Sequence, residues 1–241
     1  MLAAGGGLLL EGCDRLNRAP GFRALLRSAE PLNYRAQRLL AGGGALAPEY
    51  SAADMSPLFR TNGNTQPADP AYAALAAGGF ADWRLAVDGL VAHPLALSLA
   101  QLASLPQRAQ ITRHDCVEGW SAIGKWQGPQ LAPILRAAGL SSRARYLVLH
   151  CADSFGTAPY YESIDLDDAF HPQTILATRM NDQPLSIPHG APARLRVERQ
   201  LGYKQAKFVM GIEARESLTD FRGGKGGYWE DAADYAWYAG I

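Results

Sequence analysis

Apolar and polar positions alternate with different periods along the chain and predict short helices and strands in mixed order. Residues 20–50 follow helical spacing until Pro31 interrupts it, and a second short helical run follows and ends at Gly42. We expect these residues to form an N-terminal helical arm that packs against the main body. A basic amphipathic surface for a membrane or a partner is the alternative for the same arm.

The middle of the chain predicts a loop, a hairpin and two helices. Residues 51–70 are rich in Ser, Pro, Asn and Gly, which is typical of an extended loop. The segment WRLAVDGLV, residues 83–91, alternates around an Asp-Gly pair and predicts a β-hairpin. A short helix is expected to begin near Ser98, and residues 129–139 place their apolar side chains on one helical face with Gly139 as the stop.

The second half adds strands. RYLVLHCAD (145–153), ARLRVER (193–199) and KFVMGIEA (207–214) have the composition or alternation of strands, and residues 165–169 predict a one-turn helix. Strands and helices do not alternate in a regular βα repeat, and no internal repeat is visible. The order therefore favours an α+β domain over a doubly wound sheet.

Composition excludes some classes of function. The chain has 241 residues, 48% of them hydrophobic and 19% charged, which is typical of a folded protein with one large or two small domains. Basic and acidic side chains number 23 each and are interspersed. Because binding to nucleic acid through bulk charge needs a basic surplus, that class is excluded.

The N-terminus suggests export. No run of 18 apolar residues exists, so no transmembrane span is predicted. The opening run ends in Gly12-Cys13 and is similar to the tail of an export signal with a lipidated cysteine, although no basic residue precedes it and Glu11 replaces a small residue. We expect a remnant of an export signal at 1–19, the helical arm at 20–54 and a catalytic domain at 55–241.

The segment RHDCVEGWSAIGKWQG, residues 113–128, contains Cys116, one of three cysteines with no CxxC spacing. Its thiol has four interpretations. The first is a small core residue. The second is a nucleophile with His114 as its base, although the nearby acids Asp115 and Glu118 would oppose formation of the thiolate. The third is a zinc ligand, for which the chain offers no local partner ligands. The fourth is the single protein ligand of a soft metal whose other ligands come from an organic cofactor.

A second segment, PHGAPARLRVERQLGYKQAK (188–207), offers groups for an anionic ligand. Its cationic and flexible positions are His189, Arg194, Arg196, Gly202, Lys204 and Lys207. The alternative is a turn and an edge strand with solvated charges. The C-terminal run GGYWEDAADYAWYAGI, residues 226–241, predicts an aromatic flap that packs on the body, with a share in a substrate entrance as the alternative.

Three segments in this order, CVEGWSAIGKWQGPQL, HPQTILATRMNDQPLSIPHGAPARLRV and LGYKQAKFV, resemble the molybdopterin-binding domain of the sulfite oxidase family. The resemblance covers residues 55–241. The Cys-Val-Glu-Gly-Trp-Ser run is similar to the bacterial periplasmic branch that includes catalytic subunits of methionine sulfoxide reductase systems, and unlike the Cys-Ala-Gly-Asn run of true sulfite oxidases. The resemblance implies a sulfite-oxidase-type α+β fold with mixed sheets and short helices.

By this resemblance, Cys116 is the protein ligand of a molybdenum that carries one molybdopterin. Asp153 is a polar group near the metal, although the alignment is ambiguous between it and Cys151, which is otherwise a core thiol. The loop FRTNGNTQP matches the cofactor loop of the family, and Arg194 matches its pterin-binding arginine. The implied cofactor contacts are Thr61, Asn62, Gly63, Cys116, His189, Arg194, Gln205, Ala206 and Lys207.

The implied reaction is two-electron oxygen-atom transfer, with reduction of a sulfoxide favoured. Oxidation of sulfite or another small sulfur compound is the first alternative, and a cofactor-free binding module that kept the fold is the second. The arginine cluster that sulfite oxidases would use is absent after Cys116, as is a haem motif CxxCH. We therefore expect a separate redox partner protein, such as a membrane haem protein, and a periplasmic location with a lipid anchor at Cys13.

Overall fold

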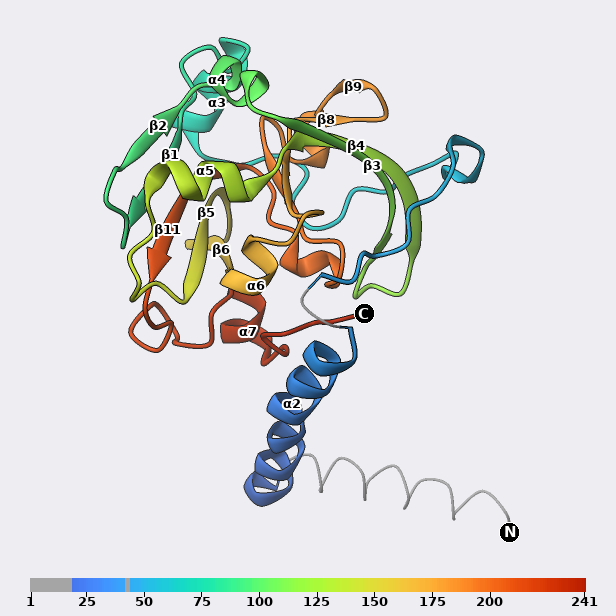
Figure 1. Cartoon of the computed structure of the whole chain (residues 1–241), viewed down its shortest axis with the longest axis vertical. Coiled ribbons are helices and arrows are strands. Elements are labelled where there is room, and N and C mark those ends of the chain that lie inside the picture. The colour runs from blue at the N-terminus through green and yellow to red at the C-terminus, as the bar shows by residue number, and fades with distance from the viewer. Residues whose placement is uncertain (1–18, 42–43) are drawn as a thin grey trace. The chain divides into compact units, whose positions relative to one another are not determined.

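The computed structural model describes residues 19–41 and 44–241, and the chain divides into two compact units after Gly43. The first unit contains helix α2 (Pro20–Ala41), which runs unbroken through Pro31 (Figure 1). The predicted interruption at Pro31 is wrong, because an internal proline removes only one backbone hydrogen bond and the remaining turns continue the helix. Residues 1–18 of the export signal predicted at 1–19, with the lipid anchor at Cys13, lie outside the described residues.

The second unit is built on three sheets. The largest has the order β2-β1-β11-β5-β6, in which β1 and β11 pair in parallel and the other pairs are antiparallel. Its strands are β1 (Leu85–Gly89), β2 (Leu95–Leu97), β5 (Tyr146–Phe155), β6 (Ala158–Asp165) and β11 (Val209–Arg215). A mixed sheet of this kind confirms the predicted α+β class.

A second sheet has the order β3-β4-β8-β9 and is dominated by a long curved ribbon of β3 and β4 (Figure 1). Its strands are β3 (Gln107–Asp115), β4 (Ser121–Pro129), β8 (Arg179–Met180) and β9 (Gln183–Pro184). The third sheet pairs β10 (Arg194–Arg196) with β7 (Ile175–Ala177). The residues just before η1 (Ala52–Asp54) also belong to this unit, because Ala47 and Glu49 hydrogen bond with Gln173.

Short helices connect the strands, and their ends follow the capping residues in the sequence. They are η1 (Ala52–Asp54), α3 (Pro70–Ala77), α4 (Leu99–Ser104), α5 (Leu131–Ala138), α6 (Leu166–Ala169), η2 (Ile187–His189), η3 (Gly202–Lys204) and α7 (Tyr228–Ala233). Ser98 caps α4 with a capping box, Asp165 caps α6, and Gly139 ends α5 with φ 66°. These three predictions are confirmed.

The hairpin predicted within residues 83–91 is wrong, because the partner strand of β1 lies beyond that segment, at Leu95–Leu97. Strands β1 and β2 pair antiparallel, whereas the Asp88-Gly89 pair is part of β1 itself. A Cβ at position 89 would lie 2.4 Å from the carbonyl oxygen of Ala214 on the neighbouring strand, so glycine is needed there for close strand approach. The Asp-Gly pair therefore reflects sheet packing.

Two apolar clusters support the cavity described below. The larger packs the five-stranded sheet against α5, and includes Trp83, Leu147 and Ile212. The smaller lies under the β3–β4 ribbon around Phe59 and Trp126. Strand β10 contacts both clusters and has all its side chains buried, so the alternative of solvated charges on this strand is wrong. No helix of the described residues is long and apolar enough to cross a bilayer.

Candidate functional site

One cavity of about 170 Å³ brings together residues that lie far apart in the sequence. Its walls come from the 62–64 loop, the turn after β3, the end of β5, the start of β6, η3 with the residues after it, and the C-terminal segment. The lining residues are Asn62, Gly63, Asn64, Cys116, Val117, Glu118, Asp153, Phe155, Tyr160, Gly202, Tyr203, Gln205, Lys207, Trp229 and Tyr235. Residues of the segments 113–128, 188–207 and 226–241 thus meet at one cavity.

Cys116 lies on a tight turn between β3 and β4. Its N–H donates to the carbonyl of Trp120 (2.9 Å) and its carbonyl accepts from the N–H of Gly119 (2.9 Å), which has φ 85°. Glycine suits this left-handed position because it has no Cβ. The turn holds the thiol at the cavity wall with only 7% of the residue exposed.

The environment of Cys116 does not support a nucleophile. Burial raises the pKa of its thiol, and the adjacent carboxylate of Glu118 adds to that rise. The nearby imidazole of His114 is fully buried, and burial together with Arg196 holds its pKa well below the ordinary value. Arg196 Nη1 donates to His114 Nδ1 (3.1 Å), so this nitrogen is occupied and is not free to accept a proton from the thiol.

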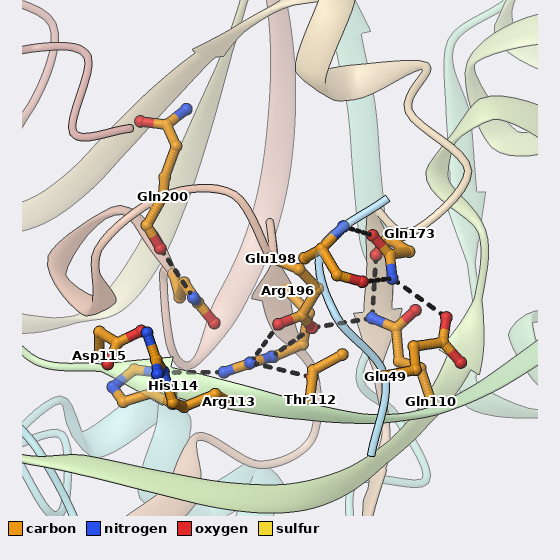
Figure 2. Close-up of polar contacts among 12 residues, drawn as sticks. Glu49, Gln110, Thr112, Arg113, His114, Asp115, Gln173, Arg196, Glu198 and Gln200 are labelled. Carbon is orange, nitrogen blue, oxygen red and sulfur yellow. Dashed lines mark hydrogen bonds and ion pairs between the residues drawn. The ribbon is translucent and has the colours of Figure 1, made fainter. Parts of the chain in front are cut away.

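A buried polar network lies behind the turn (Figure 2). Arg196 is fully buried and donates to both carboxylate oxygens of Glu198, at 2.9 and 2.5 Å, while its guanidinium lies 4.3 Å from the ring centroid of Trp126. Gln110 donates to Glu198 (2.8 Å) and extends the network to Gln173. These contacts fix His114, and with it the end of β3 from which the turn starts.

Lys207 ties two loops of the cavity together. Its ammonium donates to the backbone carbonyls of Asn62 (2.8 Å), Asn64 (2.5 Å) and Pro188 (2.7 Å). Burial and the positive charge of Arg194 lower the pKa of Lys207 to about 7. The lysine is therefore a buried cation whose charge an anionic ligand would stabilise.

Asp153 faces the same cavity from β5. Its Oδ2 accepts from Asn64 Nδ2 (3.0 Å), while its Oδ1 is buried and has no hydrogen-bond partner among the described residues. Burial raises the pKa of this carboxyl. Asp153 is thus more readily protonated than an exposed aspartate and has one oxygen free toward a ligand.

The structure divides the predicted site residues into two groups. Six of them line the cavity: Asn62, Gly63, Cys116, Asp153, Gln205 and Lys207. The other four do not, and they are Thr61, His189, Arg194 and Ala206. Ala206 packs in the main core, and its carbonyl accepts from the N–H of Leu195.

Arg194 and His189 support the cavity from behind. The guanidinium of Arg194 is fully buried and donates to the carbonyls of His189 (3.1 Å) and Gln205 (3.3 Å), while its Nε has no partner among the described residues. His189 Nε2 hydrogen bonds with the carbonyl of Phe59 (3.2 Å). Backbone carbonyls thus accept from both Nη atoms of Arg194, and a contact between Arg194 and the cofactor stays a prediction from the resemblance.

Aromatic side chains line part of the cavity, and we define Phe155, Tyr203, Trp229 and Tyr235 as its aromatic wall. Phe155 meets Trp229 edge to face at 5.0 Å, Trp229 stacks on Tyr235 at 5.9 Å, and Tyr235 meets Tyr203 at 5.1 Å. The C-terminal flap thus contributes Trp229 and Tyr235 to the cavity, whereas Tyr228 and Trp237 pack on a third apolar cluster.

Sequence reasoning missed several residues of this site. Phe59 contacts the rings of His114, Trp120, Trp126 and His189, with centroids 5.3 to 6.1 Å apart. Asn64 carries the hydrogen bond to Asp153. Both belong to the FRTNGNTQP loop itself, residues 59–67, so membership of that motif was the available signal. Tyr203 likewise lies within the LGYKQAKFV segment, whereas nothing local marks Phe155 or Tyr160.

Comparison with known proteins places these features in a family. Residues 74–220 match the model of the oxidoreductase molybdopterin binding domain. A relative from Azospira oryzae, named "Putative protein-methionine-sulfoxide reductase subunit YedZ1", is 43% identical over 160 residues, covering 66% of this chain and 56% of that protein. The protein-methionine-sulfoxide reductase catalytic subunit MsrP of Xanthomonas campestris is 33% identical, covering 65% and 52%.

Among solved structures, the sulfane dehydrogenase SoxCD from Paracoccus pantotrophus has a TM-score of 0.53 at 22% identity, covering 57% of this chain and 39% of that chain. This similarity confirms the predicted fold. The chain spans about half the length of the two sulfoxide reductase relatives.

Proposed function

The chain belongs to the sulfite oxidase family of oxidoreductases with a molybdopterin-binding domain, and on that premise we propose that it is a molybdenum enzyme that reduces a sulfoxide to a thioether. The observation that carries the proposal is the thiol of Cys116 on the wall of a cavity that also contains Asn62, Gln205 and Lys207. The names of the relatives from Azospira oryzae and Xanthomonas campestris support the sulfoxide as substrate.

The residues around the cavity fit a polar, anionic cofactor. Asn62 Oδ1 and Asp153 Oδ1 belong to lining residues and are buried polar atoms without a partner among the described residues. Unpaired buried polar atoms are costly, so a ligand that pairs with them is favoured. Lys207 adds a buried cation beside them, which suits a phosphate group.

Each residue then has a role toward the cofactor. Cys116 holds molybdenum through its thiolate, a soft donor that loses its proton on metal binding despite the raised pKa of the free thiol. Asn62, Gln205 and Lys207 hold one molybdopterin. When bound, this group supplies two-electron transfer of an oxygen atom. The protein orients the substrate and excludes water.

Asp153 supplies a proton in this proposal. Reduction of a sulfoxide consumes two electrons and two protons and yields the thioether and water. The carboxyl of Asp153 has a raised pKa and an Oδ1 without a partner among the described residues, so it holds a proton at that oxygen for the departing oxygen atom. The electrons come from a separate redox partner. A membrane haem protein as that partner, the periplasmic location and the lipid anchor stay predictions from the sequence.

The charges of the cavity favour a neutral substrate over sulfite. Glu118 and Asp153 are its acidic lining residues, and Lys207 is its one basic lining residue. The ammonium of Lys207 already donates to three carbonyls. An anionic substrate would lie near the carboxylate of Glu118, whereas a neutral sulfoxide meets the aromatic wall without that repulsion.

The test is to purify the chain from a host that makes molybdopterin and to measure molybdenum, methionine sulfoxide reduction with a viologen donor, and sulfite oxidation with ferricyanide. We expect molybdenum close to one per chain and turnover of the sulfoxide. Turnover of sulfite alone would replace the proposed substrate. Protein free of molybdenum would support the cofactor-free binding module.

A further inference from the structure

A lysine with no solvent exposure lies between two equally buried glutamates. Lys204 Nζ lies 2.6 Å from Glu162 Oε2 and 2.6 Å from Glu230 Oε1. The three side chains come from η3, β6 and α7, so the cluster joins elements that are distant in sequence. We call Glu162, Lys204 and Glu230 the buried ion cluster.

The buried ion cluster is close to neutral only if one carboxyl keeps a proton. Glu162 Oε1 and Glu230 Oε2 have no donor among the described residues, and both face Gly227, where a Cβ would lie 2.7 and 2.0 Å from them. Burial raises the pKa of Glu162 well above its ordinary value, and the negative charge of Glu230 adds to that rise. Burial alone would lower the pKa of Lys204, but the two glutamates raise it, so the ammonium stays charged.

The cluster adjoins the aromatic wall, since Lys204 Nζ lies 6.0 Å from the ring centroid of Tyr203. Lys204 stands between Tyr203, a wall residue, and Gln205, which lines the cofactor side of the cavity. Glu230 follows Trp229, another wall residue. Through the ion pair from Lys204 to Glu230, the helix that carries Trp229 is fastened to the segment that carries the cofactor contacts.

A buried ion pair is a poor way to gain stability, because desolvation offsets most of the attraction and apolar residues of similar size do as well or better. It does fix geometry, since a short ammonium–carboxylate contact allows one arrangement where apolar side chains allow several. The cluster links η3, β6 and α7, and each of these elements contributes a lining residue, which points to positioning.

We propose that Glu162, Lys204 and Glu230 are positioning residues that hold the aromatic wall at a fixed distance from the cofactor side, and so set how tightly an apolar sulfoxide binds. This inference rests on the proposed function for its substrate. The placement of the wall can be measured without turnover.

The test compares Glu230→Leu with Glu230→Gln in the molybdenum-loaded enzyme. Glu230→Leu removes the acceptor for Lys204, and we expect KM for methionine sulfoxide to rise about tenfold while kcat changes by less than about threefold. Glu230→Gln keeps an oxygen for Lys204 and mimics a protonated carboxyl, so its KM should stay within about twofold of wild type. Hydrogen exchange of residues 228–235 should be faster in Glu230→Leu alone.

Lys225→Ala is the matched control, since it removes an exposed ion pair between Lys225 and Asp234 at the end of the same segment. We expect it to behave as wild type. Unchanged KM and unchanged hydrogen exchange in Glu230→Leu would overturn the proposal. So would a loss of molybdenum with unchanged KM, which would assign the cluster to cofactor retention.

Two further arms keep the test decisive. If Glu230→Leu does not fold, Trp229→Leu keeps the cluster and removes the wall residue that it positions, and an unchanged KM in that variant contradicts the proposal. If the wild type does not reduce sulfoxides, the proposed function fails, but the hydrogen exchange of Glu230→Leu and Glu230→Gln still decides whether the cluster positions the wall.

Discussion

The ammonium of Lys207 lies 2.8 Å from the backbone carbonyl of Asn62, across 145 residues of sequence. The same ammonium reaches the carbonyls of Asn64 and Pro188. One side chain thus holds both loops in place at the cavity, and its charge is the one that an anionic cofactor would meet.

Replacement of Lys207 should weaken cofactor binding. Lys207→Met removes the three hydrogen bonds and the buried charge, and we expect affinity for the cofactor to fall about tenfold or more. Molybdenum and released pterin per protein after dialysis measure this. Lys125→Met, which removes a partly exposed ion pair with Asp182, is the control. Equal retention by both variants would contradict the role of Lys207.

The depressed pKa of Lys207 also predicts a pH dependence of stability in the cofactor-free protein. The unfolded chain keeps the proton up to the ordinary value of 10.5, whereas the folded protein releases it near 7. Between these values the unfolded state binds more protons, so the contribution of Lys207 to the free energy of unfolding rises as pH rises from about 7 to about 10.5.

Urea unfolding of wild type and Lys207→Met at pH 7 and pH 9 tests this. The free energy of unfolding of wild type relative to Lys207→Met should be higher at pH 9 than at pH 7, because Lys207 has lost its buried charge at pH 9. Neighbouring charges at Arg194 and Asp153 stay in place in both proteins. A difference that is the same at both pH values would show that Lys207 is not titrating in this range.

The network behind Cys116 predicts a large effect from a single carboxylate. Glu198→Ala leaves the guanidinium of Arg196 buried without its bidentate partner, and we expect a loss of about 3–5 kcal/mol in the free energy of unfolding. Glu216→Ala removes an exposed pair with Arg143 and should have little effect. Denaturant unfolding of wild type and both variants measures these changes in the free energy of unfolding. Similar stability of the two would mean that the buried pair contributes no more than an exposed one.

Gly202 predicts a steric effect on the turn that carries Cys116. A Cβ at this position would lie 2.5 Å from His114 Nε2, and the buried imidazole has little room to move. Gly202→Ala should therefore destabilise the protein by about 1–3 kcal/mol. In Gly78→Ala the nearest atoms are 3.7 Å away, so that variant serves as control in the same thermal unfolding series. Matching transitions would argue against a close approach at Gly202.

Local rules predicted much of the fold. Ser98, Gly139 and Asp165 each mark a helix end through hydrogen bonds or dihedral angles that depend on adjacent residues. The same rules failed where tertiary contacts determine which residue is needed at a position. The Asp88-Gly89 pair looks like a turn, but Gly89 is required by the carbonyl of Ala214, more than a hundred residues away.

The site was predictable to the extent that motif residues face the cavity themselves. Cys116, Asn62, Gln205 and Lys207 do so. Arg194 matched the same motif, but it supports the cavity from a buried strand, where alternation suggested a solvated charge. The aromatic wall was largely out of reach, because Phe155, Tyr203 and Trp229 meet only after three segments pack together.

Binding of the metal by the thiolate of Cys116 can be measured through the visible spectrum of the reconstituted protein together with its turnover. We expect Cys116→Ser to lose the thiolate-to-metal absorption and about 100-fold or more of its sulfoxide reduction. Cys151→Ser changes the cysteine of β5 outside the cavity and should keep both. Wild-type spectrum and turnover in Cys116→Ser would contradict binding of the metal by Cys116.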